Sequence, residues 1–192
     1  MPKRRLRNQP SDGQTNSMKT VGIIGGFGPE ATVLFYKELI QECRHAGLKH
    51  QPHLVVWNVP VPKKLETDLL IKNTSVKECI PLLTDAAINL ERIGADFIIL
   101  PCNTLHILTP FIRKSITIPF LSIIDTTIMH LHNNMIKRIG LLGTSMTVKH
   151  NLFAKADQAI EFVIPSPMLQ KIIDCALYEF VSTGNSTPLK KN

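Results

Sequence analysis

The sequence predicts an α/β protein with two similar halves. Short apolar runs alternate with longer stretches of helical periodicity. The order of strand, glycine turn and helix start occurs twice, at residues 21–26 (VGIIGG) and 139–144 (IGLLGT), which indicates an internal repeat. The apolar run at 96–100 ends in a polar turn with a cysteine, and in open α/β sheets functional groups lie at such carboxyl ends of strands.

Composition places the chain among globular proteins. It has 192 residues, of which 44% are hydrophobic, enough to fill a core. No run is apolar enough for a membrane helix, and no apolar stretch of a signal peptide follows the basic N-terminus. We therefore expect a cytoplasmic protein without a membrane partner. The four cysteines have neither CxxC nor zinc-ligand spacing, so reduced thiols and no metal site are expected.

The net charge of +7 is concentrated at the N-terminus. Residues 1–19 contain five Lys or Arg and one Asp, so the rest of the chain carries only +3. Residues 1–17 also lack apolar periodicity, and we expect them to form a disordered basic leader. Such a leader either binds RNA weakly through its charge or is simply solvated. The mildly basic body predicts no nucleic-acid partner.

The first half is expected at residues 18–135. Its predicted strands are short apolar runs between turn residues, at 20–25, 53–58, 96–100 and 118–123. Helices are expected from 29 to about 46, over 75–93 where Gly94 ends the pattern, and from Thr104 to about 113. Asp125 is expected to cap the helix that follows the last strand, although a catalytic role is the weaker alternative.

The glycine turn at 25–30 (GGFGPE) opens the first predicted helix. Pro29 suits a first helical turn, where its missing N–H costs nothing. The glycines, Gly26 among them, let backbone N–H groups approach an anion at the positive end of the helix. The same elements occur in dinucleotide-binding folds, but GGFGPE departs from GxGxxG and no acidic residue ends the strand at 53–58. A nucleotide site is therefore the weaker alternative.

The segment after the second strand is predicted to be a stiff surface loop, because Pro60 and Pro62 restrict its backbone. Lys63 and Lys64 are expected within this loop. Their charges either bind a carboxylate or form a solvated pair.

The second half is expected at residues 136–192. A buried strand is predicted at 138–142 and another strand at 159–164, followed by a helix from Pro167 to about 180 and a frayed end from 182. The turn at 143–147 (GTSMT) brings hydroxyl and N–H groups to a helix start, which predicts a second anion-binding site. No counterpart of the cysteine strand follows, so this half is expected to be incomplete.

Cys102 is the candidate reactive residue. It follows the strand at 96–100 within PCNTLH at 101–106, so its thiol is expected to point into a crevice. Outside such a context, a buried cysteine is usually a small hydrophobic side chain. We interpret Cys43 and Cys79 as packing or surface thiols, and Cys175 as a helix-packing thiol.

Four segments together resemble the aspartate/glutamate racemase family, in particular the aspartate racemases: GIIGGFGPEAT at 22–32, PCNTLH at 101–106, GLLGTSMT at 140–147 and QKIIDCALYE at 170–179. The resemblance runs from about residue 18 to 183. It implies two pseudo-symmetric parallel-sheet α/β halves that face a shared cleft, commonly as a homodimer. It also implies a dicarboxylic amino-acid substrate and neither pyridoxal phosphate nor metal as cofactor.

The resemblance implies a mechanism as well. Racemisation takes the α-proton from one face and returns a proton to the other, so two acid/base groups flank the α-carbon. In the family these are two cysteines, and Cys102 matches the first. A lowered thiol pKa is needed, to which hydrogen bonds from Asn103, Thr104 and His106 are expected to contribute. Substrate binding is implied for Gly26, Asn103, Thr104, Thr144, Ser145, Thr147 and Lys171, the lysine neutralising a carboxylate.

The sequence also departs from the family pattern. The second cysteine of the family lies in a GCTE-like turn that this sequence lacks, and the segment where relatives often carry a substrate-binding arginine reads VPKK at 61–64. Three functions therefore remain open. These are an impaired amino-acid racemase, a degenerate non-catalytic amino-acid-binding or interaction protein, and a relative with other carbanion chemistry that uses one cysteine.

Overall fold

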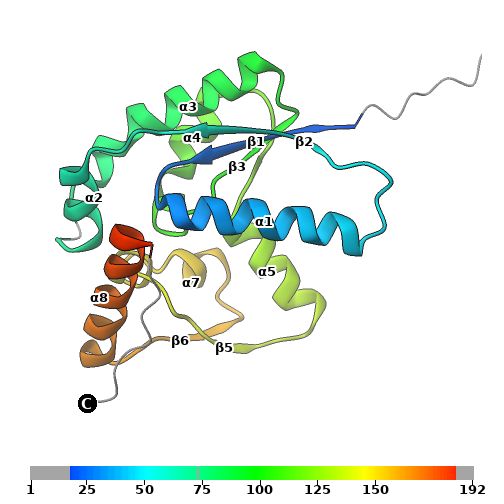
Figure 1. Ribbon diagram of the computed structural model, residues 1–192. Helices are drawn as coiled ribbons and strands as arrows, with labels where there is room; N and C mark the ends of the chain where they lie inside the picture. Colours follow the sequence, from blue (N-terminus) through cyan, green and yellow to red (C-terminus); the bar gives the residue numbers. More distant parts are fainter. Residues whose placement is uncertain (1–17, 73, 185–192) are drawn as a thin grey trace, which may run out of the picture.

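The computed structural model describes residues 18–72 and 74–184, which form an α/β protein with two parallel sheets (Figure 1). The larger sheet has the order β2-β1-β3-β4, with β1 at Thr20–Gly25, β2 at His53–Asn58, β3 at Phe97–Ile99 and β4 at Phe120–Leu121. The smaller sheet pairs β5 (Arg138–Gly140) with β6 (Glu161–Val163). The predicted leader and most of the predicted frayed end lie outside the described residues.

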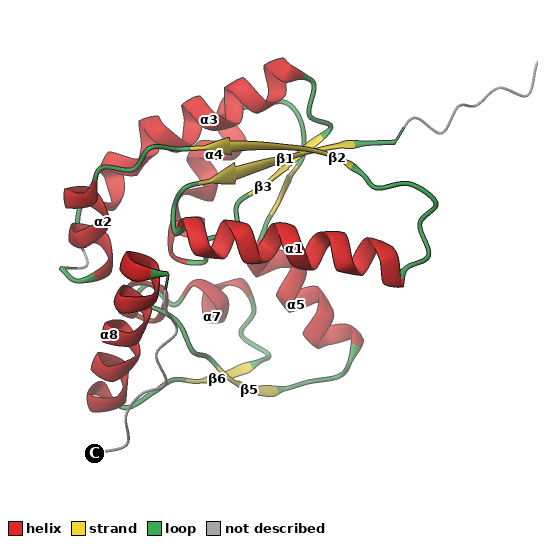
Figure 2. Cartoon of the chain, viewed as in Figure 1, coloured by secondary structure: helices red, strands yellow, loops and turns green. Residues whose placement is uncertain are grey.

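Helices connect these strands and cover the larger sheet. In Figure 2, α3 and α4 lie on one side of this sheet and α1 on the other, as expected for parallel strands joined by helical crossovers. The helices are α1 (Pro29–His45), α2 (Lys63–Leu70), α3 (Cys79–Ile93), α4 (Thr109–Ser115), α5 (Ile123–Asn133), α6 (Ser145–Lys149), α7 (Leu152–Ala156) and α8 (Pro167–Thr183). Short 3-10 helices lie at Val76–Glu78 and Thr104–Leu108.

The main hydrophobic core lies between α3 and the larger sheet. Leu83 and Leu90 of α3 are fully buried, as is Ile98 at the centre of β3. Gly22 lets α3 approach, since a Cβ atom there would lie 3.0 Å from the Ala95 Cβ and 3.3 Å from the Leu90 Cβ. Each fully buried leucine contributes about 1.5–3 kcal/mol through removal of apolar surface from water. This packing makes the larger sheet the rigid base of the molecule.

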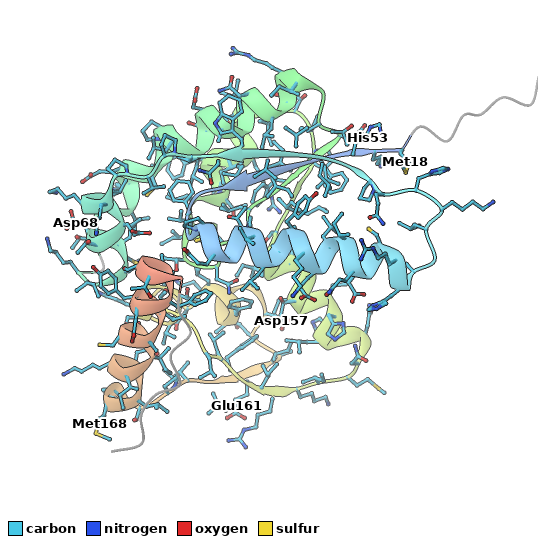
Figure 3. The ribbon with its side chains drawn as sticks, in the orientation of Figure 1. Met18, His53, Asp68, Asp157, Glu161 and Met168 are labelled. Atoms are coloured by element: carbon cyan, nitrogen blue, oxygen red, sulfur yellow. The ribbon has the colours of Figure 1, made fainter. Side chains whose placement is uncertain are left out.

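The smaller sheet is exposed, so the prediction of a buried strand at 138–142 was wrong. Arg138 and Gly140 are exposed and Leu142 retains 72% of its accessible surface. A Cβ atom on Gly140, which matches Gly22 in the repeat, would meet no described atom within 4 Å. Figure 3 shows Glu161 of β6 on the outer surface of this half. The apolar pattern is present, but the helix contact on this sheet is that of α7, whose Phe153 packs on Phe162 of β6, and it leaves Arg138, Gly140 and Leu142 exposed.

Helix α5 packs on the second half although it precedes the expected boundary at residue 135. It contacts α7, and His132 of α5 pairs with Asp157, which follows α7 (Figure 3). Leu131 of α5 and Phe153 of α7 are buried. The domain boundaries themselves stay a prediction.

Prolines explain two differences between predicted and observed elements. The strand expected at 118–123 is limited to Phe120–Leu121, because Pro119 before it cannot donate a backbone hydrogen bond to a sheet and Ser122 after it caps α5. Lys63 and Lys64 do not lie in a loop but begin α2, directly after Pro62. Lys64 pairs with the buried carboxylate of Asp68 at 2.9 Å, one turn along the same helix.

Two predicted side-chain roles were also wrong. The cap of α5 is Ser122, whose Oγ accepts the N–H of Asp125 at 3.3 Å. Asp125 forms an ion pair with Arg113 at 2.6 Å instead. Cys175 is exposed on α8 and is not a packing thiol, whereas Cys43 and Cys79 are buried. Among the described residues, no helix combines the length and apolar character needed to cross a membrane.

Replacement of Gly26 by alanine is predicted to destabilise the protein by about 2–4 kcal/mol. Gly26 has φ +93°, and a Cβ atom there would lie 2.2 Å from the backbone oxygen of Val59, which cannot move aside as a flexible side chain would. The matched control is Gly140→Ala, which meets open space and should stay within about 0.5 kcal/mol of wild type. Urea unfolding followed by circular dichroism measures both. Equal stability of the two variants would contradict the prediction.

Candidate active site

A cavity of about 260 Å³ lies where the first half meets the second. The carboxyl ends of β1 and β3 open into it, which is where open α/β sheets place their ligands. Helices α2 and α8 also line the cavity and contact each other (Figure 1). The residues lining it are Gly26, Phe27, Gly28, Ala31, Val61, Glu66, Leu69, Leu70, Pro101, Cys102, Asn103, Thr104, Leu105, Leu142, Gly143, Thr144, Thr147, Leu177 and Val181.

His106 holds the cysteine turn in place. Its Nε2 accepts the backbone N–H of Ile123 at 3.0 Å, so in the neutral ring Nδ1 carries the proton and donates to the Cys102 carbonyl oxygen at 2.8 Å. Burial lowers the pKa of His106, which favours this neutral form. Both nitrogens are therefore engaged by backbone groups. The expectation that His106 hydrogen-bonds the thiolate was wrong, and its role is to orient the turn.

The thiol of Cys102 is half-buried at the cavity wall. Burial raises its pKa, and hydrogen bonds from the backbone N–H groups of Leu105 and Thr104 oppose this effect. The pKa of Cys102 is thus raised and not lowered as expected. Behind it, burial in the core and then the nearby charge of Cys102 raise the pKa of Cys79 to about 12. Cys79 is an inert packing thiol.

Hydroxyl groups from both halves meet in the cavity. The Oγ1 atoms of Thr104 and Thr144 are 2.9 Å apart, and that of Thr147 is 3.1 Å from Thr144. Thr144 also caps α6, because its Oγ1 accepts the N–H of Thr147 at 3.2 Å. A hydroxyl can donate or accept, so these three groups can turn their protons toward a bound carboxylate.

Two of the predicted binding residues lie outside this cavity. The backbone N–H of Ser145 donates to Asp174 at 2.7 Å, and its hydroxyl donates to the second oxygen of the same carboxylate. The predicted second anion site is therefore filled by a carboxylate from α8. Gln170, one turn before Asp174, donates to the Gly143 carbonyl oxygen at 2.9 Å and stabilises this turn. Lys171 is exposed on α8 and does not line the cavity.

Glu66 is the cavity residue that sequence analysis missed. It lies on α2, whose first residues, Lys63 and Lys64, were predicted to be in a loop, and its carboxylate is half-buried. Burial and the charge of Glu30 raise the pKa of Glu66, while Lys63 acts in the opposite direction. A helical pattern starting directly after Pro62 was the available signal. The described part of the chain contains no cluster of three or more His, Cys, Asp or Glu side chains suited to a metal ion.

Comparisons with known proteins identify the family of the chain. A family model described as Asp/Glu/Hydantoin racemase matches residues 24–179. Among curated proteins, the broad specificity amino-acid racemase RacX of Bacillus subtilis (strain 168) is 32% identical over 139 residues, covering 70% of this chain. The match spans 59% of the length of RacX.

Solved structures show the same fold. An aspartate racemase homologue from Pyrococcus horikoshii OT3 matches with a TM-score of 0.71 and 26% identity, over 88% of this chain and 74% of that one. Picrophilus torridus aspartate racemase matches with a TM-score of 0.68 and 28% identity, over 86% of this chain and 69% of that one. Since the family model covers most of the residues, this chain belongs to the Asp/Glu/Hydantoin racemase family.

Proposed function

We propose that this protein exchanges the α-proton of a small amino acid, as an amino-acid racemase, with Cys102 as an acid/base group. The observation that supports this is the half-buried Cys102 thiol in one cavity with threonine hydroxyls from both halves. The family membership adds the reaction class. We also propose that the reaction uses neither pyridoxal phosphate nor metal. The cytoplasmic location and the homodimer stay predictions.

The proposed reaction begins with the Cys102 thiolate. It takes the α-proton, so the Cα–H bond breaks, an S–H bond forms and the electron pair moves into the adjacent carboxylate as an enediolate. Hydrogen bonds that strengthen as charge builds on the carboxylate oxygens lower this barrier. Thr104, Thr144 and Thr147 provide hydroxyls for these bonds. Return of a proton from the same side regenerates the substrate, and a proton from the opposite side inverts it.

The substrate is proposed to lie across the boundary between the halves. Gly26 and the exposed Asn103 line the cavity together with the three threonines and are retained as binding residues. Ser145 is not retained as a binding residue, because it is hydrogen-bonded to Asp174. Lys171 is not retained, because it lies outside the cavity. The resemblance favours aspartate or glutamate. The name of RacX describes broad specificity, which extends the candidate substrates to other amino acids.

A second candidate function is non-catalytic amino-acid binding. Cys102 is the one thiol among the described cavity-lining residues. Inversion requires an acid/base group on each face of the α-carbon. Cys43 and Cys79 are buried elsewhere, and Cys175 is exposed on α8 outside the lining. A binding protein would use the same cavity and hydroxyls without proton transfer. Isotope exchange separates the two functions.

Incubation with an L-amino acid in D2O is predicted to replace the α-proton with deuterium. Loss of the Cα–H signal is followed by NMR, and the enantiomer ratio by chiral chromatography. Cys102→Ser should slow exchange at least 100-fold, because a hydroxyl is a far weaker base than a thiolate. Cys175→Ser, which removes a thiol outside the cavity, should leave the rate unchanged.

Each result of the exchange experiment has a defined meaning. Deuterium in both enantiomers supports a racemase with an acid on each face of the substrate. Deuterium with retained configuration supports proton transfer by Cys102 alone. Exchange no faster than that of Cys102→Ser, with every amino acid tested, would overturn the proposed activity and favour the binding protein.

Alkylation of Cys102 by iodoacetamide is predicted to require a higher pH than alkylation of N-acetylcysteine. Only the thiolate reacts, and burial raises the pKa of Cys102, so its thiolate fraction rises at higher pH than in a free thiol. Peptide mass spectrometry over pH 7–11 gives the midpoint for Cys102 in the unliganded protein. A midpoint at or below that of N-acetylcysteine would show that the cavity stabilises the thiolate instead.

A further inference from the structure

We infer that Glu66 binds an ammonium group of the substrate, so that the cavity selects amino acids with cationic or neutral side chains over dicarboxylic ones. This inference rests on the proposed function, because it assigns the substrate class of the same cavity. It departs from the dicarboxylic substrate that the family resemblance implies.

The charge of the cavity wall supports this assignment. Among the described lining residues, Glu66 and Cys102 are the ionisable side chains, and no Lys, Arg or His is present. The other polar side chains belong to Asn103 and three threonines. Neutral hydroxyls suit one α-carboxylate, but the described wall offers no cation for a second carboxylate. A carboxylate side chain would instead meet the like charge of Glu66.

Glu66 itself meets no cation inside the described cavity lining, and Lys63, whose charge acts on it, lies outside that lining. The Glu66 carboxylate forms no hydrogen bond or ion pair with the residues that the structure describes, although it is half-buried. Glu30 lies near enough for its charge to act on Glu66, and the Glu30 Oε2 atom is buried without a hydrogen-bond partner among the described residues. Two neighbouring carboxylates that are both unpaired are unfavourable until a positive group arrives. An amino-acid substrate always supplies one, its α-ammonium.

The nearby lysines do not occupy this position. Lys64 and Lys72 both bind the carboxylate of Asp68, at 2.9 and 2.7 Å. Figure 3 labels Asp68 on α2, and this residue does not line the cavity. Lys63 is exposed and outside the cavity lining, as is Lys171. The positive group facing Glu66 is therefore proposed to be the substrate's α-ammonium or its side-chain ammonium.

Protection of Cys102 from iodoacetamide tests this inference without requiring turnover. L-lysine, L-alanine and L-aspartate are titrated against the full chain at pH 9, and peptide mass spectrometry follows alkylation of Cys102, with the exposed Cys175 as internal reference. L-lysine and L-alanine are expected to protect at concentrations at least tenfold lower than L-aspartate. Glu66→Gln should weaken protection by L-lysine at least tenfold and reduce the discrimination against L-aspartate. Glu66→Asp, which keeps the charge, should retain part of the protection by L-lysine.

The controls separate a specific effect from a general one. Glu38→Gln removes the same charge from an exposed position on α1 and should bind like wild type. Far-ultraviolet circular dichroism confirms that both glutamine variants are folded, and Glu66→Gln should be no less stable because it removes an unpaired charge. If Glu66→Gln weakens protection by L-lysine and by L-alanine equally, the bound group is the α-ammonium. If it weakens protection by L-lysine alone, the bound group is the side-chain ammonium.

Three outcomes would overturn the inference. These are stronger protection by L-aspartate than by the other two amino acids, no protection by any of them, and unchanged protection in Glu66→Gln. The proposed activity fails separately, through absence of deuterium exchange with every amino acid. Protection by L-lysine without exchange would thus support the role of Glu66 in a binding protein while excluding the racemase.

Discussion

The geometry of the cavity depends on the buried imidazole of His106. It joins the turn after β3 to the start of α5 through two backbone hydrogen bonds, and its ring packs on Phe120 with centroids 5.7 Å apart. A buried ring with both nitrogens satisfied is stable only in one tautomer and one orientation. Cys102 is therefore presented by a turn that follows β3 and is fixed to Phe120 of β4 and to the start of α5. The neutral ring also adds no positive charge beside the thiol.

The internal repeat does not produce two equivalent anion sites. Gly26 and Thr144 occupy the same position of the repeat, but their environments differ. Gly26 lies against the backbone of Val59 and precedes a long helix without a side-chain cap. Thr144 caps the five-residue helix α6, and the next residue, Ser145, binds Asp174. In the second half the chain has satisfied its own helix start, so only the hydroxyls of Thr144 and Thr147 remain directed to the cavity. Similar sequence patterns thus support different local chemistry.

Features set by local sequence were predicted correctly, whereas features set by contacts between distant residues were not. Strands β1 and β2 have the predicted bounds, because β-branched runs between turn residues specify a strand locally. The position of Cys102 at the cavity was predicted because the end of a strand and a polar turn are both recognisable in the sequence. The bridge between Thr104 and Thr144 spans 40 residues, and the pairing of Ser145 with Asp174 spans 29. Such contacts depend on how the halves meet, which local patterns do not encode. The helical start after Pro62 was a local signal for α2, but the place of Glu66 in the cavity wall depends on the same long-range packing.

The two ionisable groups of the described cavity wall are coupled through the substrate. Burial raises the pKa of both Cys102 and Glu66. A bound ammonium group would lower both pKa values, because a positive charge favours the thiolate and the carboxylate alike. The cavity would then generate its base when the substrate arrives. A second carboxylate on the substrate would act in the opposite direction and oppose formation of the thiolate. Substrate charge therefore bears on the chemical step as well as on binding.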